Sequence, residues 1–316
     1  MNMKNWKKLT ALALSAAMSL TLLAGCGGGT TTTPAPESKA PVAESKAPEA
    51  TPEAQKEYSE MTIDELKPLL QTVTAGKLTV ATSPDFAPYE FYAIDDAGNP
   101  HIAGFDMGLA AYVADYLGLE LEIVPIDFDG VLMELQTKSV DLGLAGLSPD
   151  PKRMGIMDFS EIYYLGGQSF VCLEKNKDKF PDLDSTNKAE YQIGAQVGSI
   201  QVDLMQTNSP DAAQIQLSKV TEIIAELLAE KLDGAYIETA VAESYKTNYP
   251  ELCVVLDVPY EAAAGSAIGV QKDNPALLAA VNLAIKAALE DGSMDKFVAE
   301  ANELASGEII EGLLDG

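Results

Sequence analysis

Along most of the chain, short runs of apolar residues alternate with longer stretches in which apolar residues recur every three or four positions. The short runs predict β-strands, and the longer stretches predict α-helices with one apolar face. In the first half, one helix is expected to be capped by Asp106 and to stop at Gly118, and another is expected to open at Asp129. Strands are expected at residues 77–82, 91–94, 101–103, 119–125 and 141–147. Strands separated by helices predict βαβ units and a largely parallel sheet.

The same alternation begins again after residue 168. Strands are expected at residues 169–173, 191–197, 214–217, 233–237, 252–258 and 266–271. Helices are expected after Ser199 and at residues 223–232, 239–246, 275–290 and 294–304. Two doubly wound lobes fit this repetition better than one large sheet. Ligands of such folds bind at the carboxyl ends of the strands or between the lobes.

The amino-terminal segment has a different pattern. Lysines precede an apolar run at residues 9–23, which has the length of a signal-peptide core and is short for a membrane span. The run ends in Leu-Ala-Gly-Cys at residues 23–26, which resembles the bacterial lipobox. That resemblance implies removal of residues 1–25 as a lipoprotein signal peptide and lipidation of Cys26.

Residues 26–57 follow as a tether, rich in Gly, Thr, Pro, Ala, Glu, Ser and Lys. Such a composition buries almost nothing, so the segment is expected to be disordered. A helical lead-in is expected at residues 58–76. This organisation predicts a body outside the cytoplasm that is held to the membrane only by its amino-terminal lipid.

Charge and composition exclude several classes of function. The 48 acidic and 21 basic residues give a net charge of −27, which is unsuited to nucleic acid or to an anionic lipid surface. The single His and the three Cys form no close cluster. A zinc finger, an iron–sulfur cluster and a His-based triad are therefore not expected, and neither is a metal or a cofactor.

Seven segments, taken in order, carry a resemblance to a known family. From residue 77 to residue 304 the chain resembles the bacterial extracellular solute-binding proteins of family 3, which serve polar amino-acid ABC transporters. The segments are Ser-Pro-Asp-Phe-Ala-Pro-Tyr-Glu-Phe (83–91), Gly-Phe-Asp (104–106), Asp-Phe-Asp-Gly-Val-Leu (127–132), Gly-Leu-Ser-Pro-Asp-Pro-Lys-Arg (146–153), Met-Asp-Phe-Ser-Glu-Ile-Tyr-Tyr (157–164), Gly-Ser-Ile-Gln (198–201) and Leu-Asp-Gly-Ala-Tyr-Ile-Glu (232–238).

The resemblance implies an α/β fold of type II, in which two doubly wound, mostly parallel lobes are joined by two hinge strands. Lobe 1 is expected at residues 77–168 and 262–316, and lobe 2 at residues 169–261. The implied protein is a monomeric, lipid-anchored substrate-binding protein on the outer face of the cell membrane, of the Gram-positive surface type. It captures a free amino acid and delivers it to an ABC permease with its ATPase subunits, and it is not an enzyme.

An α-amino acid presents a carboxylate, which is best held by a guanidinium and by backbone N–H groups. Arg153 is the only arginine in the chain and stands where the family binds the ligand carboxylate. The resemblance also places a hydroxyl and an N–H of Ser148, and the carbonyl of Gly146, against the ligand. Ser199 and Ile200 match a helix start whose N–H groups meet the carboxylate. The family has a hydroxyl at Ile200, and this chain lacks it.

The ligand ammonium needs a carboxylate. Glu238 follows a predicted strand at a position where the family usually has Asp, and its extra methylene makes the pocket slightly tighter. Phe86 and Phe128 stand where the family stacks rings on the ligand.

Ligand identity is less constrained. Members that bind Lys or Arg often carry an acid at the position of Ser83, so a polar or uncharged amino acid is favoured. A basic amino acid such as arginine or lysine stays as the alternative, because Asp85, Glu90, Asp127 and Gln168 are close enough in sequence to supply negative potential.

Two further alternatives concern chemistry. An enzyme on the same fold, such as a dehydratase, would need an acid/base pair in the cleft, for which Glu238 and Asp85 are the candidates.

Cys172 and Cys253 begin and end the second-lobe segment and are either buried thiols or a cross-strand disulfide.

Overall fold

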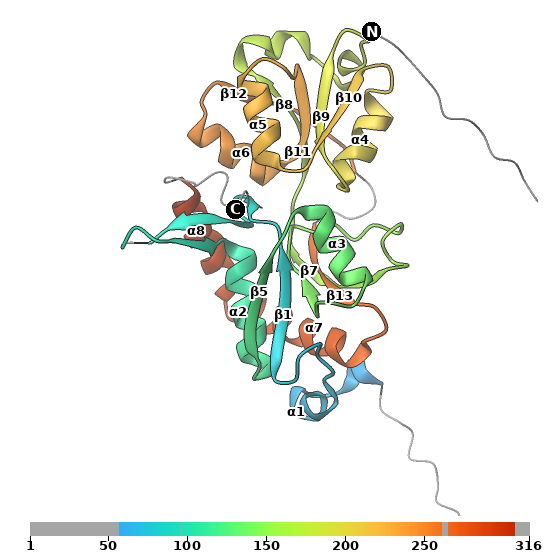
Figure 1. Ribbon diagram of the computed structural model, residues 1–316, viewed down its shortest axis with the longest axis vertical. Helices are drawn as coiled ribbons and strands as arrows, with labels where there is room; N and C mark the ends of the chain where they lie inside the picture. The colour runs from blue at the N-terminus through green and yellow to red at the C-terminus, as the bar shows by residue number, and fades with distance from the viewer. Residues whose placement is uncertain (1–56, 96, 261–264, 307–316) are drawn as a thin grey trace, which may run out of the picture. The chain divides into compact units, whose positions relative to one another are not determined.

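The computed structural model describes residues 57–95, 97–260 and 265–306 (Figure 1). The expected signal peptide, Cys26 and all but the last residue of the expected tether lie outside the described residues. Within the described ranges, no helix is long and apolar enough to cross a membrane. The expected lead-in contains a short α-helix and two 3₁₀ turns, namely α1 (Ile63–Leu66), η1 (Tyr58–Glu60) and η2 (Lys67–Leu69).

The first lobe is built on a five-stranded sheet with the order β5-β1-β6-β13-β7 (Figure 1). β1 runs parallel to both β5 and β6, and β13 runs antiparallel to both β6 and β7. Its strands are β1 (Lys77–Thr82), β5 (Glu120–Pro125), β6 (Leu142–Gly143), β7 (Met157–Tyr164) and β13 (Ser266–Gln271).

The second lobe repeats this arrangement with the order β10-β9-β11-β8-β12. β9 runs parallel to both β10 and β11, and β8 runs antiparallel to both β11 and β12. Its strands are β8 (Gln168–Leu173), β9 (Gln192–Gln196), β10 (Ala213–Leu217), β11 (Gly234–Glu238) and β12 (Leu252–Asp257).

The reversed strand of each sheet is the one that the chain forms on arriving from the other sheet. β8 opens the second lobe after β7, and β13 returns the chain to the first lobe after β12. Two connections therefore join the lobes, as the family resemblance implied. A small hairpin sheet in the first lobe contains β2 (Asp85–Phe86), β3 (Glu90–Ile94) and β4 (Pro100–Ala103).

Helices cover both faces of each sheet. In the first lobe, α2 and α7 share a buried cluster with Leu78 and Val80 of β1, whereas α3 packs with Ala81. In the second lobe, α4 packs with Phe170, whereas α5 and α6 pack with Val171 of the same strand. Because successive residues of a strand point to opposite faces, these contacts define two doubly wound lobes. The helices are α2 (Phe105–Leu117), α3 (Phe128–Gln136), α4 (Ile200–Asn208), α5 (Val220–Leu228), α6 (Thr239–Asn248), α7 (Pro275–Glu290) and α8 (Ser293–Ala305), with 3₁₀ turns η3 (Glu174–Lys179) and η4 (Leu183–Thr186).

Three sequence-based expectations about local structure were wrong. Gly104, with a φ of 119°, is the N-cap of α2, and Asp106 lies buried in its first turn. The strand expected at residues 141–147 is reduced to β6, and the backbone turns at Gly146, where φ is 55°. β7 was missed, because polar residues such as Ser160 interrupt its apolar positions.

Candidate functional site

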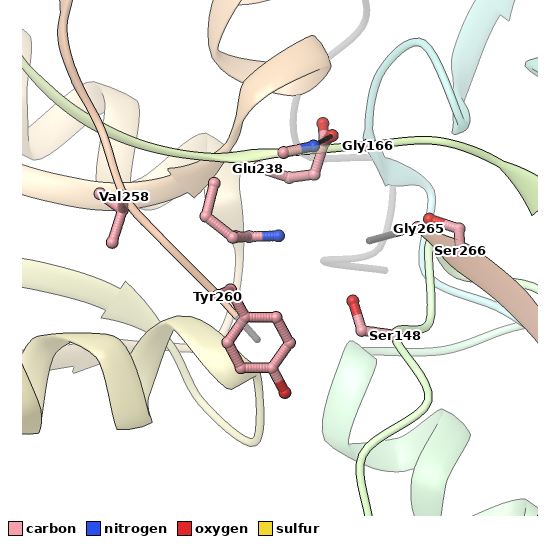
Figure 2. Close-up of a pocket in the computed structure, with 9 residues that line it drawn as sticks. Ser148, Gly166, Glu238, Val258, Tyr260, Gly265 and Ser266 are labelled. Atoms are coloured by element: carbon pink, nitrogen blue, oxygen red, sulfur yellow. Dashed lines mark hydrogen bonds between the residues drawn. The ribbon is translucent and has the colours of Figure 1, made fainter. Parts of the chain in front are cut away.

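A pocket of about 90 Å³ lies where both connections between the lobes meet the ends of the strands (Figure 2). Hydroxyl, amide and carboxylate groups face it, so it suits a small polar ligand. Glu238 is the only carboxylate among its nine lining residues, and neither Lys nor Arg is among them. The lining residues are Ser148, Gly166, Gly167, Gln168, Glu238, Val258, Tyr260, Gly265 and Ser266.

Glu238 is held at the junction of β11 and α6. It ends the strand and acts as the N-cap of the helix, where its Oε2 accepts a hydrogen bond from the Val241 N–H at 2.9 Å. Its Oε1 accepts a hydrogen bond from the Gly167 N–H at 3.3 Å. The side chain is buried, and this burial raises the pKa of Glu238 to about 7 against the opposing effect of the backbone hydrogen bonds. A cation beside this carboxyl group would favour its ionised form.

The connection between β7 and β8 passes directly over Glu238. A Cβ atom at Gly166 would lie 2.7 Å from the Glu238 Oε1 and 3.0 Å from the Tyr89 Oη. Any side chain at Gly166 would therefore displace the carboxylate or the tyrosine, so glycine is needed here for a close approach.

Arg153 lies in the loop after β6 and is also buried. Its Nη1 donates a hydrogen bond to the Ser148 carbonyl oxygen at 3.3 Å, and its Nη2 donates one to the Gly198 carbonyl oxygen of the second lobe at 2.9 Å. The guanidinium lies 5.5 Å from the centre of the Phe128 ring. Among the described residues no carboxylate comes within ion-pair distance of Arg153, so its hydrogen-bonding partners are neutral carbonyl groups. Burial lowers the pKa of Arg153, the expected response of a cation removed from water.

A buried acid, Asp106, holds the turn at Gly146 by a hydrogen bond. Asp106 accepts a hydrogen bond from the Gly146 N–H at 3.1 Å and another from the Tyr163 hydroxyl at 2.7 Å. A Cβ atom at Gly146 would lie 2.6 Å from the Phe86 ring, so the ring packs directly on this turn. Asp106 is thus a support of the loop that carries Ser148 and Arg153.

Ser199 and Ile200 begin α4, but neither lines the pocket. The Ser199 hydroxyl donates a hydrogen bond to the Gln196 carbonyl oxygen at 2.7 Å and does not cap the helix. Ile200 is buried, and as the first residue of α4 it has no intrahelical acceptor for its N–H.

The structure thus brings the sequence-predicted residues together only in part. Ser148 and Glu238 line the pocket, where Figure 2 shows Glu238 across from Ser148 and Tyr260. Phe128 lies against Arg153, and Phe86 lies on Gly146. Tyr260, in the connection between β12 and β13, and Ser266, the first residue of β13, were missed, because neither lies in any of the seven motifs.

The sequence suggested Asp85 as a source of negative potential or as one member of an acid/base pair, but in the structure its carboxylate bonds across the two lobes. Its Oδ2 accepts hydrogen bonds from the Val220 N–H at 2.6 Å and from the Gln196 Nε2 at 3.1 Å, both in the second lobe. Its Oδ1 accepts one from the Ser83 hydroxyl at 2.7 Å. Burial raises the pKa of Asp85 to about 6. The residue therefore ties the β2 hairpin to the start of α5.

Known proteins resemble more than half of this chain. The chain is 32% identical over 225 residues to the arginine-binding extracellular protein ArtP of Bacillus subtilis, covering 70% of this chain and 84% of that protein. It is 24% identical over 181 residues to the cyclohexadienyl dehydratase of Pseudomonas aeruginosa, covering 57% of this chain and 66% of the enzyme. A solved structure of the amino acid ABC transporter substrate-binding protein AbpA from Streptococcus pneumoniae, bound to L-arginine, superimposes with a TM-score of 0.70 at 30% identity, covering 74% of this chain and 97% of that one.

The family comparison agrees with these similarities. Residues 78–301 match the family described as bacterial extracellular solute-binding proteins, family 3. The match contains all seven motifs, both sheets apart from the first residue of β1, and the pocket between them. The resemblance and the two-lobe fold read from the sequence are confirmed, and the chain belongs to the bacterial extracellular solute-binding proteins of family 3.

Proposed function

We propose that this protein captures a free amino acid between its two lobes and delivers it to the permease of an ABC importer. One observation carries the proposal. Arg153 in the first lobe and Glu238 in the second lobe are buried charges of opposite sign, and neither has an ion-pair partner among the described residues. A buried charge without a partner is costly, and the carboxylate and ammonium of an α-amino acid complement both.

The remaining residues have supporting roles in this proposal. Arg153, the Ser148 hydroxyl and the N–H groups of Ser199 and Ile200 receive the carboxylate, and Glu238 receives the ammonium. The carbonyl of Gly146 is a further acceptor for the ammonium. Phe86 and Phe128 enclose the aliphatic part of the ligand, which removes apolar area from water.

Arginine is the first ligand to test. ArtP is named for arginine and AbpA was solved with L-arginine bound, at 32% and 30% identity. The pocket is consistent with a basic ligand, because its only charged lining residue is an acid. A polar or uncharged amino acid, which the absence of an acid at Ser83 favours, is the second candidate.

Binding without turnover is the simpler chemistry for this pocket. Acid/base catalysis needs two titrating groups in reach of the ligand, and the lining offers one carboxylate, Glu238, beside the phenol of Tyr260, whose pKa is raised by burial. The relation to a dehydratase keeps a cleft enzyme as the rival function. Chromatography of amino acids and of cyclohexadienyl compounds after incubation with the protein separates the two: unchanged compounds support a binder, and a dehydrated product refutes it.

The ligand is identified by a thermal-shift screen of the twenty amino acids, followed by calorimetry. A ligand at a hundred times its Kd stabilises the folded state by about 2.7 kcal/mol, which raises the melting temperature by several degrees. We expect L-arginine to give the largest shift, with glutamine and histidine as the comparison ligands. No shift with any amino acid refutes the proposed function.

The proposed location is the outer face of the cell membrane, with the lipid on Cys26 as the anchor and the tether between Cys26 and the body of the protein. Replacing Cys26 with Ser is expected to release the protein into the medium or to leave it unprocessed. Cys253→Ser is the matched control and is expected to remain in the membrane fraction. Unchanged fractionation of the Cys26 variant contradicts the anchor.

A further inference from the structure

The two cysteines that the structure describes lie opposite each other in the second lobe. Cys172 is in β8, Cys253 is in the neighbouring antiparallel strand β12, and the two are register partners. Two residues along, the Glu174 N–H donates a hydrogen bond to the Glu251 carbonyl oxygen at 2.7 Å. Hydrogen-bonded and non-hydrogen-bonded pairs alternate along an antiparallel ladder. Cys172 and Cys253 are therefore a hydrogen-bonded pair like Glu174 and Glu251, and the Cα atoms of such a pair are about 5.5 Å apart. This spacing lies inside the range of roughly 4.4–6.8 Å found in disulfides.

Both side chains also project from the same face of the sheet. Residues directly opposite in an antiparallel pair share a face. Cys172 belongs to the buried cluster around Phe170 and Tyr236, and Cys253 packs against that same cluster. The Cys172 Sγ donates a hydrogen bond to the Leu173 carbonyl oxygen at 3.3 Å. Rotation about the Cα–Cβ bond of Cys172 is therefore needed to direct its sulfur toward Cys253.

We propose that Cys172 and Cys253 form a disulfide that joins β8 to β12. β8 is the first strand of the second lobe and β12 is its last, so the bond would close the chain of this lobe into a covalent ring. The family is described as extracellular, and disulfides form and persist in that environment.

The oxidant is a small-molecule or protein disulfide, for which oxidised glutathione is the laboratory probe. Cys253 is the more exposed of the two, so its thiolate attacks one sulfur of the probe and displaces a glutathione thiolate. The Cys172 thiolate then attacks the Cys253 sulfur and displaces the second glutathione. Two protein thiols are oxidised, one disulfide is reduced to two thiols, and the protons pass to the departing thiolates.

The surroundings of Cys253 influence the rate of the first step of this exchange. Burial and the neighbouring Glu174 carboxylate raise the pKa of the Cys253 thiol, whereas Lys246 and Lys177 oppose that effect. Fewer thiolates mean slower attack. Replacing Glu174 with Gln removes the nearby negative charge and is expected to speed oxidation.

The bond is expected to stabilise the lobe without altering ligand affinity. The pair lies toward the end of β8 that is remote from Gln168, the strand residue that lines the pocket. Cross-linking two distant positions removes conformational freedom mainly from the unfolded chain. This inference is independent of which amino acid binds, so it can fail while the proposed function holds.

The first test is mass spectrometry of the full-length chain after export to an oxidising compartment. Trypsin should release peptides 154–175 and 247–272 as one linked species, lighter than their sum by two hydrogen atoms. Reduction should separate them and make both cysteines react with iodoacetamide. The proposal is overturned if both cysteines are alkylated without reduction, in the exported protein and in protein refolded with oxidised glutathione.

The second test compares the oxidised and reduced forms of the same protein. We expect oxidation to raise the melting temperature by roughly 5–10 °C, with ligand affinity unchanged within about twofold. Cys253→Ser, which alters the half-buried partner and spares the buried one, should show no response to oxidant. Equal melting temperatures for the two wild-type forms overturn the stabilising cross-link.

Discussion

The two lobes share one strand order but hold the two charges of the proposed ligand site in different ways. In the second lobe, β11 runs directly into α6, and Glu238 is fixed as the helix N-cap by two backbone N–H groups. In the first lobe, a loop separates β6 from β7, and Arg153 is held there by backbone carbonyl groups and by the Phe128 ring. A strand–helix junction thus provides a rigid carboxylate, whereas a loop provides a guanidinium that reaches the other lobe.

This difference also explains why neither lobe is complete alone. Arg153 in the first lobe and Glu238 in the second lobe are buried with no opposite charge within ion-pair distance among the described residues, and the raised pKa of Glu238, about 7, reflects that cost. A zwitterionic ligand offsets the cost in both lobes at once. The ligand therefore binds more tightly to a closed form, in which both lobes contact it, than to either lobe separately. This difference in affinity is the condition for ligand-driven closure.

The largest effect is expected from the first-lobe charge. Arg153→Ala should cost about 3 kcal/mol or more, roughly a hundredfold in ligand affinity, because the carboxylate of the ligand loses its charged partner. Arg153→Lys should recover only part of this, since a point charge cannot form two parallel hydrogen bonds. The control is Lys286→Ala, which also removes one positive charge but at an exposed position on α7. Calorimetry that gives wild-type affinity for both Arg153 variants refutes the role of Arg153.

The second-lobe charge should give a smaller effect that depends on pH. The ligand ammonium requires ionised Glu238, whose pKa without ligand is about 7, so affinity should fall about tenfold between about pH 8 and about pH 6, with proton release on binding. Glu238→Gln should weaken binding roughly 30-fold at the higher pH and abolish this dependence.

Glu243→Gln, on the exposed side of α6, is the matched control for Glu238 and should retain the wild-type pH profile. Calorimetry in buffers of different ionisation enthalpy counts the protons. A Glu238 variant that keeps the wild-type pH profile rules out this carboxylate as the ammonium partner.

The smallest of the three effects is expected at Asp85, which bonds the other lobe and does not line the pocket. Asp85→Asn loses one acceptor oxygen facing Val220 and Gln196, so closure should become less favourable and affinity should fall about fivefold. Small-angle scattering at a subsaturating ligand concentration should show less compaction than in wild type. Asp115→Asn, on the exposed face of α2, should behave as wild type. Equal compaction of the Asp85 variant contradicts its role in closure.

The sequence predicted the regular elements better than the contacts between them. β1 and α7 have the predicted bounds, because an apolar run and a helix with Pro at its start are local signals. Asp106 was assigned to a helix cap because Asp is common there, but its carboxylate instead supports the Gly146 turn, which lies 40 residues away. No local pattern could reveal that pairing.

In the candidate site, too, local features could be predicted from the sequence, whereas contacts between distant segments could not. Glu238 could be expected from its place at a strand end, where parallel strands present ligand-binding groups. The bonds of Asp85 to α5 and β9 depend on the meeting of the two lobes, which leaves no trace in residue spacing. The Gly166 approach to Glu238 was likewise invisible, because a glycine in a connection has no distinctive neighbour in sequence.

The most direct test of the account measures how well the protein distinguishes L-arginine from agmatine, which lacks only the carboxylate. Calorimetry of both ligands with wild type and with Arg153→Ala forms a cycle that isolates the pair between Arg153 and the carboxylate. We expect wild type to prefer L-arginine by roughly fiftyfold or more, and Arg153→Ala to prefer it by less than about threefold. If Arg153→Ala keeps the full wild-type preference, the ligand carboxylate is bound elsewhere and the proposed division of charges between the lobes is wrong.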